Sequence, residues 1–451
     1  MQPNPLLANP ILPTLARLSW PNMIAMLASA LVAIAETGYV GVLGIAPLAG
    51  IALVFPMVAL QQMMSAGAMG GGVSSAISRA LGAGDVERAQ ALARHATVIG
   101  AVAGASFTVL FLALGPRIFG MLGGSGAALE QALVYSNTVF LGAAFIWLTN
   151  TFASVLRGTG NMRVPSVALF AASGLQVVLG GGLGLGLGPF PRLGMTGIAL
   201  GQVLSFLACA LFFGAYLTSG RARIRLRILG PLRREMFRDI LKVGAVACVS
   251  PLQSVATVLV MTRLISGFGT EAIAGYGIGA RMEFLLVPIA FAIGVASVPM
   301  VGMAIGAGRV SRARRVAWSA AGMAAVMVGT IGVVVALAPD LWSALFTDDE
   351  AVLASARAYF RSAGPAYAFF GGALVLYFAS QGSRRILGPV LAQTVRLLVV
   401  AVGGGWLLSR GAQAGEFFTL VGVSLTAYGL ASAYAVWRAD WEPPGVRAPK
   451  A

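Results

Sequence analysis

Long uninterrupted apolar runs constrain this chain more than any other feature of its sequence. The segments Trp318–Ala338 and Gly194–Leu217 each run without a single charged residue. A helix that crosses roughly 30 Å of hydrocarbon needs about 20 predominantly apolar residues. Charged residues make up only 10% of the chain, whereas soluble globular proteins carry roughly 25%. The sequence therefore predicts an all-α polytopic membrane protein.

Twelve membrane spans can be placed along the chain. Their expected ranges are 13–41, 47–73, 91–115, 130–156, 163–188, 194–218, 239–266, 273–305, 313–338, 356–382, 388–409 and 416–437. Because this number is even, both termini are expected on the same side of the membrane.

The distribution of basic residues indicates which side that is. The chain has 31 Lys and Arg residues against 15 Asp and Glu. Most basic residues lie in the connections after even-numbered spans and near the termini, and few, such as Arg117 and Arg192, lie elsewhere. Cytoplasmic loops carry the excess of Lys and Arg. We therefore expect a multi-pass protein of the cell inner (plasma) membrane with both termini cytoplasmic, whose basic loops contact membrane lipids and not nucleic acid.

An internal repeat divides the chain into two halves. Residues 82–89 read Gly-Ala-Gly-Asp-Val-Glu-Arg-Ala, and residues 306–313 read Gly-Ala-Gly-Arg-Val-Ser-Arg-Ala. The same shift relates Gly158 to Gly382 and Pro165 to Pro389. Two six-helix units with the same orientation are predicted, which form two pseudo-symmetric lobes. The expected domains are an N-terminal lobe (1–218), a basic cytoplasmic linker (219–238), a C-terminal lobe (239–437) and a cytoplasmic tail (438–451).

The duplication favours a transporter over other classes of membrane protein. Two lobes on either side of a midplane cavity can rock and open it alternately to each side. The chain has no Gly-x-x-x-x-Gly-Lys-Ser/Thr motif of nucleotide-hydrolysing motors, so transport would draw on an ion gradient. A membrane-embedded enzyme is the alternative, but the spans contain no paired catalytic acids, metal ligands or nucleophile–base set. We expect no enzyme activity, no cofactor and no metal.

Glu36 is the first candidate for ion coupling. It lies inside the first span, and an ionisable residue within a span marks a functional site by default. Removal from water disfavours the charged form of a carboxyl, so the group can exchange a proton near neutral pH. The neighbouring Thr37 could add an oxygen for a Na⁺ ion. The alternative is that Glu36 lies near the outer end of the span and faces water.

Glu283 is the second candidate acid. It lies in the eighth span two positions from Arg281, so the two side chains do not face each other on a helix. Each needs a partner elsewhere, and Arg263 and Arg396 are the other internal cations. A structural salt bridge and a role in substrate binding both remain open for these residues.

Further residues within the spans are candidates for a substrate cavity or a hinge. Polar or polarisable side chains that could line a cavity are Gln61, Met64, Asn150, Gln253, Tyr367, Tyr377 and Gln381. Hydrogen bonding between helices, or core packing for Met64, is the alternative for each of them. Pro21 and Pro251 lie early in the first span of each half, and a proline inside a helix kinks it. They are therefore candidate hinges.

Several short motifs, taken in order, resemble those of the multidrug and toxic compound extrusion (MATE) family. The matching features are Pro21 followed by an acid 15 positions later, Leu48-Ala49-Gly50, Ser78-Arg79 before Gly82-Ala83-Gly84-Asp85, Leu156-Arg157-Gly158-Thr159-Gly160-Asn161 before Pro165, and Ile273-Ala274-Gly275-Tyr276-Gly277-Ile278 with Arg281. The resemblance extends over about residues 12–437.

The resemblance implies a V-shaped exporter of amphipathic or cationic organic compounds, driven by H⁺ or Na⁺. Glu36 stands where many members of the family have a coupling aspartate. Gln176 and Gly180 stand where members often have Asn and Asp, which weakens a Na⁺ site and favours H⁺ antiport. Na⁺ antiport and a flippase for lipid-linked oligosaccharides are the alternatives. The chain is expected to work as a monomer.

Overall fold

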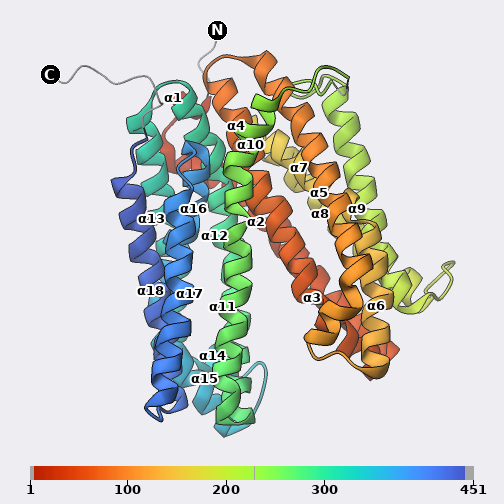
Figure 1. The fold of residues 1–451 in the computed structure, drawn as a ribbon, viewed down its shortest axis with the longest axis vertical. Helices are drawn as coiled ribbons and strands as arrows, with labels where there is room; N and C mark the ends of the chain where they lie inside the picture. The colour runs from red at the N-terminus through yellow and green to blue at the C-terminus, as the bar shows by residue number, and fades with distance from the viewer. Residues whose placement is uncertain (1–4, 228, 442–451) are drawn as a thin grey trace. The chain divides into compact units, whose positions relative to one another are not determined.

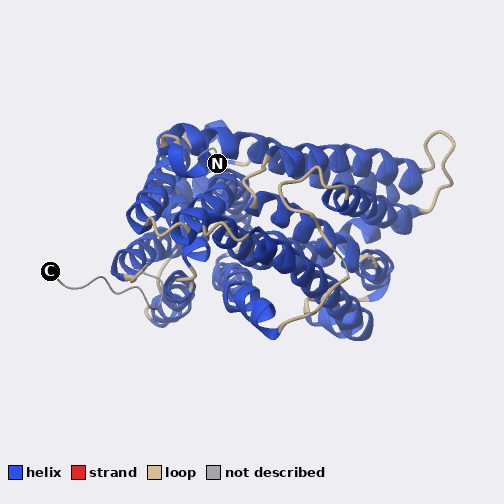
Figure 2. Ribbon diagram, turned by 90° about the horizontal axis from the view of Figure 1, so that it is seen from above, coloured by secondary structure: helices blue, strands red, loops and turns tan. Residues whose placement is uncertain are grey.

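The structure is a computed structural model that describes residues 5–227 and 229–441. Helices form nearly all of its regular structure, and no strand occurs in the part of the chain that is described (Figure 2). Most of the expected tail, including Arg447 and Lys450, lies outside the described residues.

The predicted membrane architecture is confirmed. Within the described residues, 11 helices are long and apolar enough to cross a membrane. The pair α6 (Gly126–Leu141) and α7 (Ala143–Gly158) gives a twelfth span if it is counted as one helix that bends by 48°. The bend falls at Gly142, inside the range 130–156 that the sequence predicted as one span.

Contacts divide the chain into two compact units, each described by itself. The first unit covers Trp20–Gly244. It holds α2 (Ile11–Leu43) from Trp20 onward, α3 (Ile45–Gln62), the π-helical segment η1 (Met63–Met69), α4 (Gly70–Gly82), α5 (Val86–Met121), α6, α7, α8 (Arg163–Leu185), α9 (Gly194–Thr218) and most of α10 (Arg234–Ala247) (Figure 1). A core of aromatic and aliphatic side chains fills it, in which the ring of Phe111 stacks on that of Phe140.

The second unit combines the start of the chain, up to Ser19, with everything from Ala245 onward. Its helices are α1 (Pro5–Ala8), the first turns of α2, α11 (Val249–Ile265), η2 (Ser266–Phe268), α12 (Thr270–Gly306), α13 (Val310–Leu337), α14 (Asp340–Ser343), α15 (Glu350–Ala363), η3 (Gly364–Ala366), α16 (Tyr367–Ser383), α17 (Leu387–Ser409) and α18 (Ala414–Arg438) (Figure 1). The chain passes between the units inside α2 and inside α10. The boundaries expected for the lobes, the linker and the tail stay predictions.

The repeated motif folds into the same turn in both halves. After α4, Gly84 has φ +80°, and the amide of Asp85 donates to the carbonyl of Ala80. After α12, Gly308 has φ +72°, and the amide of Arg309 donates to the carbonyl of Ala304. This left-handed conformation suits glycine and lets the carbonyls at a helix end find partners. The sequence repeat is therefore a structural repeat.

Candidate functional site

Glu36 lies buried inside α2, with 8% of its surface exposed. Its Oε1 accepts a hydrogen bond of 2.8 Å from Nε2 of Gln176 on α8. The environment of the carboxyl is set by its burial and by this hydrogen bond from a neutral amide. Burial removes the water that would stabilise a carboxylate, and a neutral amide restores only part of that stabilisation.

Neighbouring contacts fix the register of α2 against α8. The hydroxyls of Ser29 and Ser173 lie 3.5 Å apart. Further along both helices, a side chain at Gly181 would collide with the ring of Tyr39 at 2.9 Å. The contacts advance together along the two helices, so α2 and α8 run in the same direction. This agrees with their places as the first and fifth spans, and it brings Gln176 opposite Glu36.

Two other side chains bear on the Glu36 site. Thr37 is exposed, and its hydroxyl donates to the carbonyl of Ala33 in its own helix. Tyr135 on α6 is buried, interacts electrostatically with Glu36, and donates its hydroxyl to Oε1 of Gln202 at 3.3 Å. Sequence reasoning did not single out Tyr135, because a tyrosine in so apolar a segment is compatible with ordinary packing.

Glu283 on α12 belongs to a second polar cluster, in the other unit. Its Oε1 accepts a hydrogen bond of 2.5 Å from the Tyr359 hydroxyl on α15. Its Oε2 lies 3.5 Å from Nη2 of Arg396 on α17. Both charged side chains are largely shielded, with 18% of Glu283 and 8% of Arg396 exposed. The partner that the sequence left unidentified for Glu283 is thus Arg396, assisted by Tyr359.

The residues around this cluster are aromatic. The Arg396 guanidinium lies 5.8 Å from the ring centroid of Phe370. Tyr276 and Tyr367 are buried and interact electrostatically with both Glu283 and Arg396. Arg281 has a different partner, because its guanidinium lies 5.1 Å from the centre of the Phe346 ring. Arg281 and Glu283 therefore point to separate surroundings, as their spacing predicted.

The expected cavity residues of the first unit lie around the π-helical segment η1. Asn150 on α7 is buried, and its Nδ2 donates to Oε1 of Gln62 at 2.9 Å and to Oγ of Ser65 at 2.8 Å. Gln61 is fully buried, and neither polar atom of its side chain has a hydrogen-bond partner within the described part of the chain. Met64 lies in η1 and is half-buried. The structure thus gathers these three predicted residues around one irregular stretch of helix.

The expected cavity residues of the second unit are more dispersed. Gln253 on α11 is half-buried, and its Nε2 donates to Oγ1 of Thr394 on α17 at 2.6 Å. Tyr367, beside the Glu283 cluster, and Gln381, near the end of α16, are fully buried. Tyr377, also on α16, is buried and bonded to the backbone of α10. Lining a cavity stays a prediction for all of these residues.

The two candidate hinge prolines have different settings. Pro21 lies inside the continuous helix α2. Pro251 follows a break at Cys248 between α10 and α11. Because proline lacks an N–H, the carbonyl four residues earlier, that of Ala247, loses its helical partner. The Tyr377 hydroxyl donates to this carbonyl at 3.0 Å. The break is therefore stabilised by a specific side chain.

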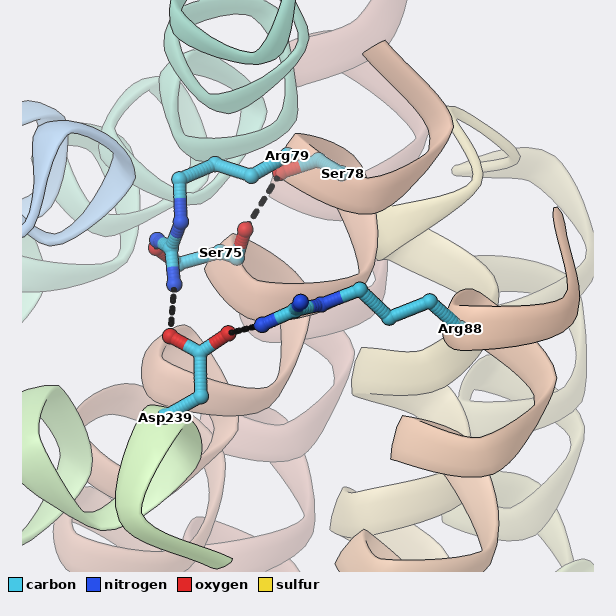
Figure 3. A network of polar contacts seen from close by, with 5 residues as sticks. All are labelled: Ser75, Ser78, Arg79, Arg88 and Asp239. Carbon is cyan, nitrogen blue, oxygen red and sulfur yellow. Dashed lines mark hydrogen bonds and ion pairs between the residues drawn. The ribbon is translucent and has the colours of Figure 1, made fainter. Parts of the chain in front are cut away.

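A charged network ties α10 to the first unit (Figure 3). Asp239 is buried, and its two carboxylate oxygens accept from Nη2 of Arg79 at 2.9 Å and from Nη2 of Arg88 at 3.1 Å. Arg79 also donates to the hydroxyl of Ser75. Sequence reasoning grouped Asp239 with the first residues of a span and missed this role.

The repeat places a related arrangement in the second unit. Arg312 stands at the position that corresponds to Arg88. Its guanidinium donates to the carbonyls of Leu6, at 3.0 Å, and Asn9, at 2.6 Å. In both units the repeated arginine therefore holds the segment that leads into the first span of a half.

No group of three or more His, Cys, Asp or Glu residues that could hold a metal ion occurs among the residues described. The two candidate acids Glu36 and Glu283 instead meet an amide, a phenol and a guanidinium. These partners suit the exchange of protons or the binding of organic groups.

The family model described as MatE matches residues 21–180 and 247–407, more than half of the chain. The chain belongs to the MATE family. It is thus a multi-pass membrane transporter and not an enzyme, as its repeat predicted.

Individual relatives of this MATE transporter agree with that assignment. It is 25% identical to the FAD transporter of Shewanella oneidensis over 398 residues, which cover 88% of this chain and 87% of that protein. It is 28% identical to the multidrug export protein MepA of Staphylococcus aureus over 277 residues, 61% of this chain and 60% of that protein.

Solved structures of related transporters have the same fold. A multidrug resistance MATE family transporter of the MOP superfamily, in an outward-facing conformation, is 25% identical and matches with a TM-score of 0.85 over 97% of each chain. A MOP superfamily transporter from Pyrococcus furiosus is 24% identical and matches with a TM-score of 0.87 over 96% of each chain.

Proposed function

We propose that this MATE transporter exports small amphipathic organic compounds across the cell inner membrane in exchange for protons, with Glu36 as the coupling carboxylate. The observation that carries the proposal is the buried contact between Glu36 and Gln176. Glu36 is shielded from water, and none of the described residues forms an ion pair with it, so its carboxylate needs a counter-charge from elsewhere. A proton from one side of the membrane, or a cationic substrate from the other, can supply that charge in turn.

The contacts around Glu36 favour H⁺ over Na⁺. Gln176 presents its Nε2, a donor, toward the carboxylate, whereas a hard cation is held by several converging oxygens. The Thr37 hydroxyl is directed to the backbone of its own helix and is exposed. In the described structure, therefore, neither Gln176 nor Thr37 directs an oxygen at the Glu36 carboxylate.

Glu283 is the second candidate for coupling, but its setting favours Glu36. Arg396 lies at 3.5 Å and Tyr359 donates to the carboxylate at 2.5 Å. Glu283 thus has a cation beside it that can balance its charge, whereas the hydrogen-bond partner of Glu36 is a neutral amide.

The proposed cycle is alternating access by two lobes of a monomer whose termini face the cytoplasm. Protonation of Glu36 would change what α2 packs against, and the hinges at Pro21 and Pro251 would let α2 and the α10–α11 junction bend. The named substrates of relatives, FAD for one and drugs for another, span a wide range of small organic molecules. They are consistent with an exporter of amphipathic compounds.

Everted membrane vesicles test this proposal directly. A pH gradient (ΔpH) is imposed across the membrane of vesicles that contain the transporter, and uptake of the fluorescent cation rhodamine 123 is measured over time. Collapse of ΔpH should stop transport, whereas a Na⁺ gradient of either sign should leave it unchanged. Uptake that follows the Na⁺ gradient, or that ignores both gradients, would refute proton antiport. Vesicles without the transporter give the background.

A further inference from the structure

Arg396 is a buried cation whose hydrogen-bonding groups are only partly used. Its contact with Glu283 is 3.5 Å long, beyond the usual 2.7–3.2 Å of an N–H···O hydrogen bond. Its Nε lies buried without a hydrogen-bond partner among the residues described. A structural pair between Arg and a carboxylate is commonly short and bidentate. Arg396 therefore has donor capacity that the protein itself does not use.

Tyr359 explains why Glu283 does not use that capacity. Its hydroxyl donates to Oε1 of Glu283 at 2.5 Å and draws the carboxylate toward α15. Arg396 on α17 meets only Oε2. The acid is thus held by one neighbour while the guanidinium remains available to another acceptor.

The surroundings of Arg396 offer an approach for a polar group. On α17 and the adjacent α11, the residues Thr394, Gln253 and Ser254 are polar and half-buried. Nε2 of Gln253 donates to Thr394, whereas its Oε1 is buried without a hydrogen-bond partner among the described residues. Gln393 precedes Arg396 by three positions, on the same face of α17, and its Nε2 donates to Oγ of Ser254 on α11 at 2.9 Å. A half-buried polar side chain therefore lies about one helical turn along α17 from Arg396.

Charge balance defines the compound that this cluster accepts. Glu283 and Arg396 together carry no net charge. A compound with a cation alone would add an uncompensated charge beside Arg396, which is costly in a shielded site. A compound with both an anionic group and a cationic nitrogen can pair its anion with Arg396 and its cation with Glu283. These two pairs replace the 3.5 Å pair between Glu283 and Arg396, and the site gains no net charge.

We infer that Arg396 is the anchor for an anionic group, a carboxylate or phosphate, on the exported compound, and that Glu283 receives the compound's cationic nitrogen. The aromatic rings of Phe370, Tyr276 and Tyr367 supply the apolar contacts that an amphipathic body needs. This exporter therefore prefers amphipathic zwitterions to otherwise similar compounds that carry only a cation. The inference rests on the proposed export function and adds the residue that selects among substrates.

Two dyes that differ in one group test the inference. Rhodamine 123 is a methyl ester and a permanent cation, and rhodamine 110 is the same dye with a free carboxylate. Binding of each to the purified transporter in lipid nanodiscs is measured by fluorescence anisotropy. We expect the wild type to bind rhodamine 110. Arg396→Gln should weaken binding of rhodamine 110, relative to rhodamine 123, by about tenfold or more, the usual effect of losing a hydrogen bond to a charged group.

Control variants separate anchoring from a structural role. Arg396→Lys keeps the charge and should retain part of the preference for the carboxylate dye. Arg410→Gln removes an exposed arginine just beyond the same helix, whose guanidinium lies 4.3 Å from the centre of the Trp406 ring, and should leave the ratio of affinities unchanged. The inference is overturned if the wild type does not bind rhodamine 110, or if Arg396→Gln weakens both dyes equally.

This measurement is independent of coupling. Binding in nanodiscs involves no ion gradient, so a failure of proton antiport in vesicles leaves the binding result standing. Conversely, a transporter that couples to ΔpH but shows no dependence on Arg396 retains the proposed function and loses only the assignment of substrate class. A melting curve of each variant in detergent confirms that the protein used is folded.

Discussion

Two acids within the spans of this transporter, the buried Glu36 and the half-buried Glu283, have different partners. Glu36, in one compact unit, meets the neutral amide of Gln176. Glu283, in the other, meets the Arg396 guanidinium and the Tyr359 phenol. Among the residues that the structure describes, no cation pairs with Glu36, whereas Arg396 lies 3.5 Å from Glu283. Duplication of the fold has therefore not duplicated the chemistry.

The repeat shows where the difference arose. When Pro21 is aligned with Pro251, the residue of the second half that corresponds to Glu36 is Ser266. The turns after α4 and α12 are alike in backbone geometry, but the acid of the second half stands on α12 and not on its first span. The backbone is thus alike at the repeated turn, whereas the acids Glu36 and Glu283 stand on non-corresponding helices of the two halves.

The largest effect that would test this comparison is on coupling. Glu36→Gln should reduce ΔpH-driven uptake of rhodamine 123 to the background of empty vesicles, because glutamine cannot carry a proton. Glu283→Gln should lower the rate, yet the remaining uptake should still collapse with ΔpH. The measurement is initial uptake in everted vesicles at equal protein content. If the Glu36 variant kept coupled transport and the Glu283 variant lost it, the roles of the two acids would be exchanged.

The second effect is on stability. Arg396→Gln leaves Glu283 without its cation in a shielded site, and should lower the free energy of unfolding by about 3 kcal/mol. The double variant Glu283→Gln/Arg396→Gln removes both charges and should recover most of that loss. Thermal midpoints in detergent provide the measurement. Equal destabilisation by the single and double variants would mean that packing around the arginine matters and the ion pair does not.

A smaller loss is expected at the amide partner of Glu36. Gln176→Leu removes one buried hydrogen bond, and such bonds between membrane helices contribute about 0.6–2 kcal/mol. Thr37→Val, at an exposed position bonded only to its own helix, should change the thermal midpoint less and serves as control. A larger loss for Gln176→Leu than for Arg396→Gln would reverse the ranking of the two sites.

The smallest effect concerns an acid outside the spans. A hydrogen bond from Arg357 holds the pKa of Asp340 below its usual range. Its contribution to stability is present above the pKa of about 3.9 of an unfolded chain, and it disappears as the pH falls through the lower folded value. Because Asp340 is exposed, Asp340→Asn should shift the midpoint at pH 7 only slightly. A shift of the thermal midpoint as large as that of Arg396→Gln would show that the exposure of an ion pair does not determine how much it stabilises the protein.

Much of the fold follows from the sequence because apolar run length and charge placement act locally. The membrane-spanning helices needed only these signals, and the repeat needed only the matching motifs at residues 82–89 and 306–313. The bend at Gly142 was missed because glycine is common inside membrane helices and often causes no break. The π-helical stretch Met63–Met69 was missed for a similar reason, since nothing in its residues opposes an ordinary α-helix.

The candidate site was predictable in its members and not in its pairings. Glu36, Gln176, Glu283 and Arg396 all stand out as polar residues in apolar spans. Which of them meet depends on how helices more than 100 residues apart in the sequence pack together, since 140 residues separate Glu36 from Gln176 and 113 separate Glu283 from Arg396. Tyr359 and Asp239 gave no signal, because the first resembles a packing aromatic and the second lies at the edge of a basic segment.

The division of the chain inside α2 and α10 has a consequence for biogenesis. Residues 5–19 belong to a body that is otherwise made from residues 245–441, and the Arg312 side chain that holds Leu6 and Asn9 is synthesised about three hundred residues after them. During translation, residues 5–19 therefore cannot form these contacts until most of the polypeptide has been synthesised. The N-terminal segment is thus held in place only after Arg312, in the second half of the chain, has been made.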